Sequence, residues 1–488
     1  MAEETIEQKE DLPKKLLSNM LFDIGYVNVF IALSSGVFMT GLLLLFGANN
    51  SQIGLITSIP LFAQIVAPVF SFYIDRSKER RRLCLKTIFP IRILWIIIAT
   101  LPVLVYYKLL PIPLTVMTII IGLIAFLGVY SGTVWMSWMA DLIPEKHRGF
   151  VFGRRMMIGG LVLALVGFAG GRYLDFWKDN QYFGFSSMLG VASICGLISF
   201  VYLSRFPEVP NQHSGGGDFS FMTIPNKFLE IAKNKNFLNL VFYNASIGFA
   251  TSLIGVYVTV FMLKEMKLSY TFLSIMVIAH SLTYLSLAEF WGKLIDKYGC
   301  KPILIVCTRA MIIFPLIVIY AVHNKWILIP MNVVAGIFWC GLELSQFNAI
   351  LKLSPKQDRA MYIGFNTMVT SIACAVAPII GGFMIDEIGA AKFNLLFIGW
   401  GGFQILFFIG GVLRYIPTLF LKSIVEPKEE KIEEVVRVIR TTIGTGFIDG
   451  MGVLINYMII PVQTARHLIE HLIDHKHVHK TDKKDAEH

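Results

Sequence analysis

Apolar runs long enough to cross a membrane recur along most of this chain. Between roughly residues 20 and 415, stretches of about 18 or more predominantly apolar residues alternate with short polar loops. A helix needs about 20 such residues to cross the ~30 Å hydrocarbon core of a bilayer. Hydrophobic residues make up 55% of the 488 residues and charged residues only 16%, whereas soluble domains carry about 25% charged residues. We therefore predict an all-α polytopic membrane protein.

The apolar runs predict twelve transmembrane helices, divided in the middle by the longest loop. This loop, residues 205–235, has the Gly-rich stretch "HSGGGD" at its centre, which is typical of a flexible linker. The expected spans are residues 20–46, 52–74, 86–107, 112–140, 152–173, 184–204, 236–263, 270–295, 302–322, 326–351, 360–385 and 393–415. They predict a six-helix bundle at 20–204 and a second one at 236–415, with an N-terminal segment at 1–19 and a C-terminal extension at 416–488.

The basic residues gather in one set of loops. The loops 75–87, 141–155, 292–302 and 352–359 hold sixteen Lys and Arg, whereas the alternate set holds seven. Because cytoplasmic loops carry the excess of Lys and Arg, we expect the first set and both termini to be cytoplasmic. The net charge of +10 is then explained without a nucleic-acid partner. The expected location is the plasma (inner) membrane, with the first span as its own targeting signal.

Motifs repeat in the two halves of the chain. Three pairs of stretches correspond in order: "SFYIDRSKERRRLCL" with "GKLIDKYGCKPILI", "LIPEKHRGFVFGRR" with "LSPKQDRAMYIGFN", and "GGRYLD" with "GGFMID". The first pair aligns Asp75 with Asp296, and Arg92 corresponds to Arg309. Such a repeat indicates two homologous six-span halves, related by an axis along the membrane normal.

The two copies "YIDRSKERRR" and "LIDKYGCKP" resemble the signature of the major facilitator transporters between spans 2 and 3 and between spans 8 and 9. The first copy departs from the family pattern, since Phe72 and Ser77 stand where glycines are common, whereas the second keeps Gly292 and Gly299. The resemblance covers roughly residues 20–415. It implies transport of a small solute by alternating access, driven by a gradient.

The repeated loops are expected to form a cytoplasmic gate. The carboxylates of Asp75 and Asp296 end spans 2 and 8, where each could cap the positive N-terminus of a helix. The resemblance implies spans 11 and 5 of the opposite half as these helices. Basic residues expected to pair across the same seam are Arg76, Arg80, Arg148, Lys297, Lys301 and Arg359. The alternative, that the basic residues only set the topology and bind lipid headgroups, stays open.

Polar side chains inside the spans are candidates for a substrate and coupling site. Glu343 lies deep in span 10 without an evident basic neighbour. Burial disfavours the charged form of a carboxylate, which suits proton coupling, and a hydrogen-bonded structural acid is the alternative. The resemblance implies that spans 1, 4, 7 and 10 line the cavity, so further wall candidates are Trp135, Trp138, Asn244 and Gln346. Asn28, Gln64, His280 and Asp23 add polar groups at other depths, and Asp23 could simply face cytoplasmic water.

Glu289 and Arg309 lie at similar depths in spans 8 and 9, and we expect them to form a structural ion pair rather than to bind substrate.

The C-terminal extension predicts an amphipathic helix and carries a histidine cluster. Val435, Val438 and Ile439 share one side of a helix, and the following "FIDGMGVLINYMIIPV" favours an interfacial segment over a thirteenth span. Further on, His467, His471 and His475 are spaced to share one helical face, where neutral imidazoles could hold Zn, Cu or Ni. A solvated or pH-responsive face is the alternative.

We therefore predict a secondary active transporter for a small solute, with a proton as the candidate coupling ion and the lipid bilayer as its surroundings. A non-transporting assembly factor, delivery factor or sensor that acts through the C-terminal tail is the alternative. The chain has no P-loop and no Gly-x-Ser-x-Gly, His-Glu-x-x-His or Cys-x-x-Cys motif, so we predict neither an enzyme nor a cofactor.

Overall fold

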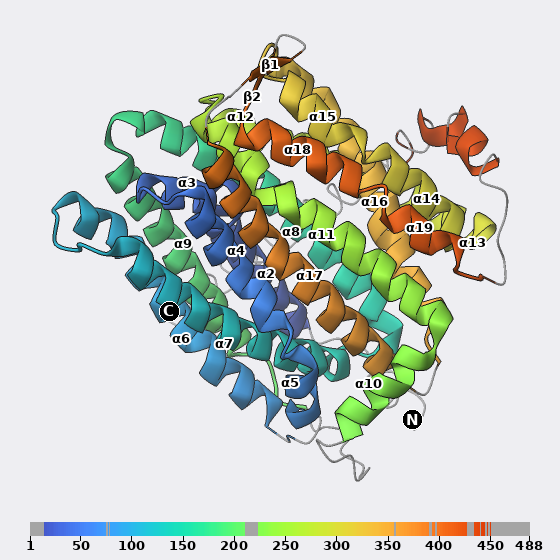
Figure 1. Cartoon of the computed structure of the whole chain (residues 1–488). Helices are drawn as coiled ribbons and strands as arrows, with labels where there is room; N and C mark the ends of the chain where they lie inside the picture. The colour runs from blue at the N-terminus through green and yellow to red at the C-terminus, as the bar shows by residue number, and fades with distance from the viewer. Residues whose placement is uncertain are drawn as a thin grey trace, which may run out of the picture.

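The computed structural model describes residues 14–426, except 75–76, 78, 210–222, 356–357, 390–392 and 396–397, together with parts of 434–449. Long helices run side by side through the molecule (Figure 1). In this part of the chain, 11 helices are long and apolar enough to cross a membrane, or 12 when the bent pair α12–α13 is taken as one span. The predicted all-α membrane fold is confirmed.

The first half contains spans 1 to 6. Its elements are α2 (Lys14–Ser34), α3 (Gly36–Leu45), α4 (Asn50–Gln64), α5 (Ala67–Ile74), α6 (Arg80–Tyr106), α7 (Pro113–Leu142), α8 (Glu145–Phe176), the short η1 (Lys178–Asn180) and α9 (Gln181–Leu203). Span 1 is divided at Gly36, whose positive φ of 58° favours glycine. Span 2 is divided before Pro68, because proline has no N–H for the carbonyl of Gln64.

The second half contains spans 7 to 12. A linker helix, α10 (Thr223–Lys233), precedes α11 (Lys235–Lys264), α12 (Tyr270–Ser286), α13 (Ala288–Tyr298), α14 (Cys300–Ala310), α15 (Ile313–Tyr320), the short η2 (Lys325–Ile327), α16 (Leu328–Leu353), α17 (Arg359–Ile388), β1 (Phe393–Leu395), β2 (Ile398–Trp400), α18 (Gly402–Leu413) and α19 (Pro417–Lys422). The helices α12 and α13 meet at an angle of 46°.

Three boundaries differ from the sequence prediction. The first helix begins at Lys14 rather than at residue 20, and α8 begins at Glu145 rather than at 152. Residues 393–400, expected to begin the twelfth span, contain the antiparallel pair β1–β2, and the span starts at Gly402. The first two starts are missed because polar residues in the first turns of a helix look like loop residues. Residues 393–400 are predominantly apolar, so their sequence resembles the beginning of a span.

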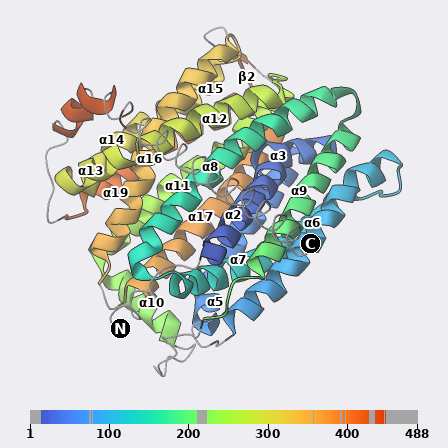
Figure 2. The same cartoon turned by 180° about the vertical axis from the view of Figure 1, so that it is seen from behind.

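The two ends of the bundle carry different elements. The linker end carries α10, and the hairpin end carries β1 and β2 (Figures 1 and 2). Both views show the helices of the two halves running between these ends. Apolar side chains fill the interior of each half, and one apolar cluster joins α2 to α9 with α11, α12 and α18.

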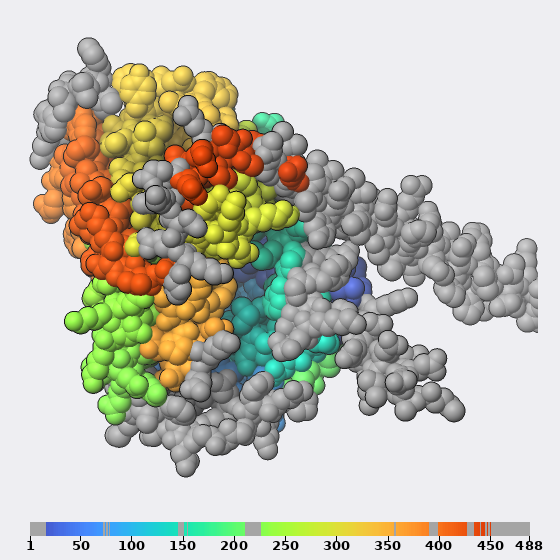
Figure 3. Space-filling model, turned by 90° about the vertical axis from the view of Figure 1, so that its right-hand side faces the viewer, coloured from blue at the N-terminus to red at the C-terminus, as the bar shows by residue number. Residues whose placement is uncertain are grey.

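The two halves meet along α4 with α17 and along α8 with α12. Glycines permit the close approach at these contacts. A Cβ on Gly382 of α17 would lie 2.5 Å from the carbonyl oxygen of Asn50, and one on Gly171 of α8 would lie 2.8 Å from that of Tyr270. Figure 3 views the second seam, with teal α8 beside the yellow-green residues of α12 and α13.

Candidate functional site

Two cavities share Trp339 and Glu343 of α16. One, of about 230 Å³, lies within the second half, between α11, α16 and α17. The other, of about 280 Å³, is lined by α12 and α16 of the second half and by Gly160 on α8 of the first. The second cavity therefore lies between the two halves.

Glu343 is held by two neutral donors. The hydroxyl of Tyr284 on α12 donates to Oε2 at 2.7 Å, and the indole Nε1 of Trp339, one turn away on α16, donates to Oε1 at 2.6 Å. The side chain is exposed in the cavity rather than buried as expected. Among the residues that the structure describes, no basic side chain forms an ion pair with it. The cavity thus contains an acidic group whose charge is not neutralised by a neighbouring base.

An amide network fixes the wall of the smaller cavity. Asn244 on α11 donates to Oδ1 of Asn366 on α17 at 2.9 Å, and Gln346 on α16 donates to Oδ1 of Asn244 at 3.1 Å. All three residues line the cavity. Asn244 and Gln346 lie where the sequence analysis expected them, whereas Asn366 was missed, although it corresponds to Arg155 in the internal repeat.

The corresponding position of the first half is occupied by charged residues. The Oδ2 atom of Asp23 on α2 lies 3.7 Å from the guanidinium of Arg155 on α8, and its Oδ1 accepts a hydrogen bond of 2.7 Å from Ser199. The guanidinium also lies over the Trp135 ring, 4.4 Å from its centre. Asp23 is buried, not facing water, because α2 begins upstream of the predicted start. Arg155 was counted as a loop residue in the sequence analysis, which is why it was missed.

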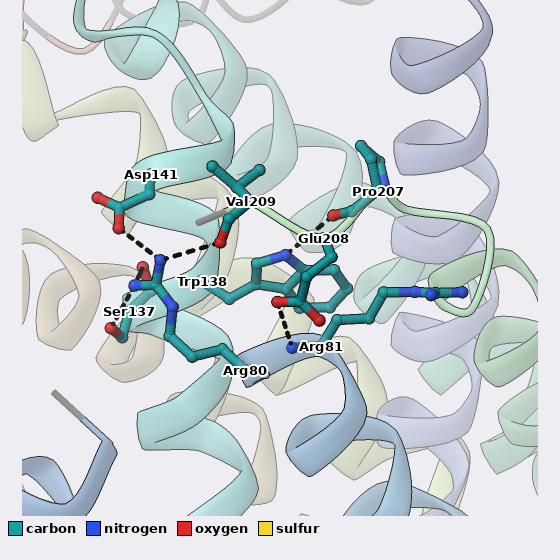
Figure 4. A network of polar contacts seen from close by, with 8 residues as sticks. All are labelled: Arg80, Arg81, Ser137, Trp138, Asp141, Pro207, Glu208 and Val209. Carbon is teal, nitrogen blue, oxygen red and sulfur yellow. Dashed lines mark hydrogen bonds and ion pairs between the residues drawn. The ribbon is translucent and has the colours of Figure 1, made fainter. Parts of the chain in front are cut away.

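The arginine-rich stretch after span 2 forms contacts inside the first half (Figure 4). The Arg80 guanidinium, fully buried, donates to Oδ2 of Asp141 at 2.6 Å and to the Ser137 hydroxyl at 3.0 Å. The backbone N–H of Arg81 donates to Glu208 at 3.1 Å. These contacts join the start of α6 to the end of α7 and to the segment after α9. Arg80 does not reach the opposite half in this structure, so its expected pairing across the gate is not formed here.

Trp138 belongs to the same region and not to a cavity wall. Its side chain is fully buried and its Nε1 donates to the carbonyl oxygen of Pro207 at 3.1 Å (Figure 4). It points toward the segment after α9, whereas Trp135, three residues earlier on the same helix, contacts the Arg155 guanidinium. The prediction of Trp138 as a wall residue was wrong.

The predicted cytoplasmic gate is not assembled by the members that the structure describes. Asp296 is exposed and has no hydrogen bond or ion pair with a described residue. Lys297 lies over the ring of its neighbour Tyr298, Lys301 donates to the carbonyl of Ile424 at 2.9 Å, and Arg359 donates to that of Leu351 at 3.4 Å. All of these contacts are within the second half. Asp75, Arg76 and the side chain of Arg148 lie outside the described residues.

Carboxylates do cap helices of the opposite half, but at the hairpin end. Asp175, the last residue of "GGRYLD", accepts hydrogen bonds from the backbone N–H groups of Tyr270 and Thr271 at 2.9 and 2.8 Å, at the start of α12. Asp386, the last residue of "GGFMID", accepts from the side chain of Asn50 at 2.7 Å and from the N–H of Ser51 at 2.8 Å, at the start of α4. The repeat had aligned the two acids without indicating this role.

The remaining candidates are separate from one another. Glu289 pairs with Lys293 of its own helix at 2.7 Å, and Arg309 is exposed, so the expected Glu289–Arg309 pair is not formed. His280 lines the larger cavity and stacks on Tyr284. Asn28 donates to its own helix at Ile24, and Gln64 is exposed at the end of α4.

No metal site is present in the described part of the chain, where no three His, Cys, Asp or Glu residues gather closely enough to hold an ion. His467, His471 and His475 lie outside this part, so the predicted histidine site stays a prediction.

The curated relatives of the chain include proteins named as transporters. It is 24% identical over 304 residues to a putative proline/betaine transporter of Staphylococcus aureus, a match that covers 58% of this chain and 62% of that protein. The quinolone resistance protein NorA of Staphylococcus aureus is 24% identical over 151 residues, or 31% of this chain and 37% of NorA. The chain thus matches about 62% of the length of the first relative.

Solved structures share the fold. A mutant of the nucleoside transporter NupG superposes with a TM-score of 0.66 at 13% identity, covering 84% of this chain and 100% of that one. The D-xylose–proton symporter gives a TM-score of 0.62 at 18% identity, covering 85% and 98%. The family model described as "Major Facilitator Superfamily" matches residues 24–271 and 240–468. With two matches that together extend over most of its length, the chain belongs to the Major Facilitator Superfamily.

Proposed function

We propose that the protein is a secondary active transporter that moves a small solute across the membrane by alternating access. The observation that carries the proposal is the cavity at Glu343, which is lined by Gly160 of the first half and by α12 and α16 of the second. A site between two half-bundles can open to one side at a time when the halves rock against each other. The printed names of the relatives, a proline/betaine transporter among them, support this activity.

We assign proton coupling to Glu343. As a carboxylate it accepts hydrogen bonds from Tyr284 and Trp339. A protonated carboxyl group becomes a donor itself, and an indole N–H can only donate, whereas a tyrosine hydroxyl can also accept. Protonation at Oε2 therefore reverses the hydrogen bond between Tyr284 on α12 and Glu343 on α16, while Trp339 can still donate to Oε1. A change of this bond directly beside the cavity couples proton binding to the contact between the two helices.

The linker end is assigned to the cytoplasm and the hairpin end to the outside. The Lys- and Arg-rich loops lie at the linker end, in agreement with the positive-inside rule. The plasma membrane is the expected location.

The test is transport by the full-length chain in proteoliposomes that contain a pH-sensitive dye. Sugars, nucleosides, amino acids and quaternary ammonium compounds are added in turn, and both solute uptake and proton movement are measured. We expect at least one class to cause proton movement that Glu343→Gln abolishes. The matched control is Glu289→Gln, which removes a charge from an exposed residue outside the cavity. Uptake of all classes at the rate of protein-free vesicles would contradict the proposal.

The alternative of a non-transporting factor acting through the C-terminal tail is not favoured by the relatives, which are transporters. Deletion of residues 451–488 separates the two functions, because it spares Val435, which is buried in the second half. A transporter keeps its solute-dependent proton movement after this deletion. A tail-dependent factor loses its activity.

A further inference from the structure

We infer that the cavity at Glu343 recognises its solute through a positively charged group of the ammonium type. The inference rests on the proposed transport function and adds the chemical class of the solute. Three features of the cavity carry it: its charge, its aromatic lining and its neutral polar groups.

The charged residues that line the cavities are of one sign only. Of the described residues that line the two cavities, Glu343 is the only acidic one, and neither Lys nor Arg is among them. The partners of the carboxylate, Tyr284 and Trp339, are neutral. They orient the group and leave its negative charge uncompensated. An anionic solute would be repelled there, whereas a cation would supply the missing charge.

Aromatic side chains surround the same carboxylate. Trp339, Tyr284 and His280 all line the larger cavity, and the rings of His280 and Tyr284 stack with centres 6.4 Å apart. The faces of Trp and Tyr rings attract cations, and tryptophan does so most strongly. A carboxylate with aromatic rings on its sides suits an alkylated ammonium group, which cannot donate several hydrogen bonds and is bound by charge and by ring faces.

The smaller cavity offers neutral polar groups next to the charge. Thr370 lines it, and its buried hydroxyl has no hydrogen-bond partner among the described residues. Gln346 and Asn244, which line the same wall, are fixed in position by one hydrogen bond between them and by the bond from Asn244 to Asn366. We therefore expect the solute to be small, with one cationic group at Glu343 and an uncharged hydrogen-bonding group directed toward Thr370.

Choline and its uncharged carbon analogue 3,3-dimethyl-1-butanol test this inference, because they have nearly the same shape and differ in charge. Tetramethylammonium serves as a second cation without a hydroxyl. Binding is measured as the shift in melting temperature of the full-length protein in nanodiscs, and as inhibition of the solute-dependent proton movement. Both cations should give a concentration-dependent shift, and the neutral analogue should need at least a tenfold higher concentration.

Substitutions at Glu343 and Glu289 distinguish the loss of the cavity's charge from a loss of folding. Glu343→Gln should lose the response to both cations, Glu343→Asp should keep it, and Glu289→Gln should respond as the unmodified protein does. An equal response to choline and its neutral analogue, or an unchanged response in Glu343→Gln, overturns the inference. If sugars or nucleosides drive proton movement while neither cation binds, the transport function stands and the cationic class is wrong. If no solute class is transported, the proposed function fails as well.

Discussion

At the scale of single residues, the two halves make an equivalent contact with different chemistry. Spans 1 and 5 are joined by Asp23 and Arg155, whereas spans 7 and 11 are joined by Asn244 and Asn366. Only 5% of the Asp23 side chain is exposed, so water does little to stabilise its charge. Its ionised form depends on Arg155 and on the hydroxyl of Ser199. Replacing one partner should therefore cost more stability in the charged pair than in the amide pair.

Replacing Arg155 by Gln should destabilise the protein by about 3 kcal/mol, because a buried carboxylate loses the cation with which it forms its ion pair. The double variant Asp23→Asn with Arg155→Gln, which copies the amide pair of the second half, should recover most of this loss. Thermal unfolding of the purified variants measures both changes. Equal losses in the single and the double variant would show that the charge of Asp23 is not what Arg155 stabilises.

At the scale of helices, span 9 shows how a break is compensated. Pro315 in α15 has no N–H for the carbonyl of Met311, and the helix is interrupted between Ala310 and Ile313. The buried guanidinium of Arg414, at the end of α18, donates to this carbonyl at 2.6 Å. An arginine of span 12 thus replaces the hydrogen bond that proline removed from span 9.

The variant Arg414→Met should cost about 1–3 kcal/mol, since it leaves the Met311 carbonyl buried without a donor. Pro315→Ala restores the backbone N–H, so the double variant should be more stable than Arg414→Met alone. Denaturation of the three variants in detergent gives the two differences. If Pro315→Ala brings no recovery, the Met311 carbonyl is not the group that needs Arg414.

The sequence predicted the helices better than their ends and bends. Apolar length and the internal repeat were enough for the twelve-span, two-half fold, because both depend on patterns that extend over tens of residues. The start of α2 at Lys14 and the bend between α12 and α13 depend on local packing, which the apolar pattern does not contain. For the site, depth in a span pointed to Glu343. Depth did not separate Trp135, which contacts Arg155, from the fully buried Trp138, because a nearly all-apolar helix does not reveal from its sequence which side faces the cavity.

At the scale of the whole molecule, the repeat aligned carboxylates at both ends of the bundle, and only the structure distinguishes the ends. Between described residues, hydrogen bonds from one half to the other lie toward the hairpin end, at Asp175, Asp386 and their neighbours. The exposed Asp296 at the linker end has no such bond. Two conformations of a transporter differ by only a few kcal/mol. A sequence that encodes both therefore does not reveal which set of contacts is formed.

The caps at the hairpin end should set the balance between these conformations. Each carboxylate satisfies N–H groups at the start of a helix in the opposite half, and removal of such a cap costs about 1 kcal/mol. The double variant Asp175→Ala with Asp386→Ala should thus lose about 2 kcal/mol of contact energy between the halves, which corresponds to a roughly 30-fold shift toward opening of the hairpin end. Hydrogen exchange should become faster in the first turns of α4 and α12.

Asp296→Ala, which removes a carboxylate of the repeat without a described partner, is the matched control and should leave this exchange unchanged. Unaltered exchange in the double variant would mean that the close backbone packing at Gly171 and Gly382, rather than the carboxylates, holds the hairpin end together.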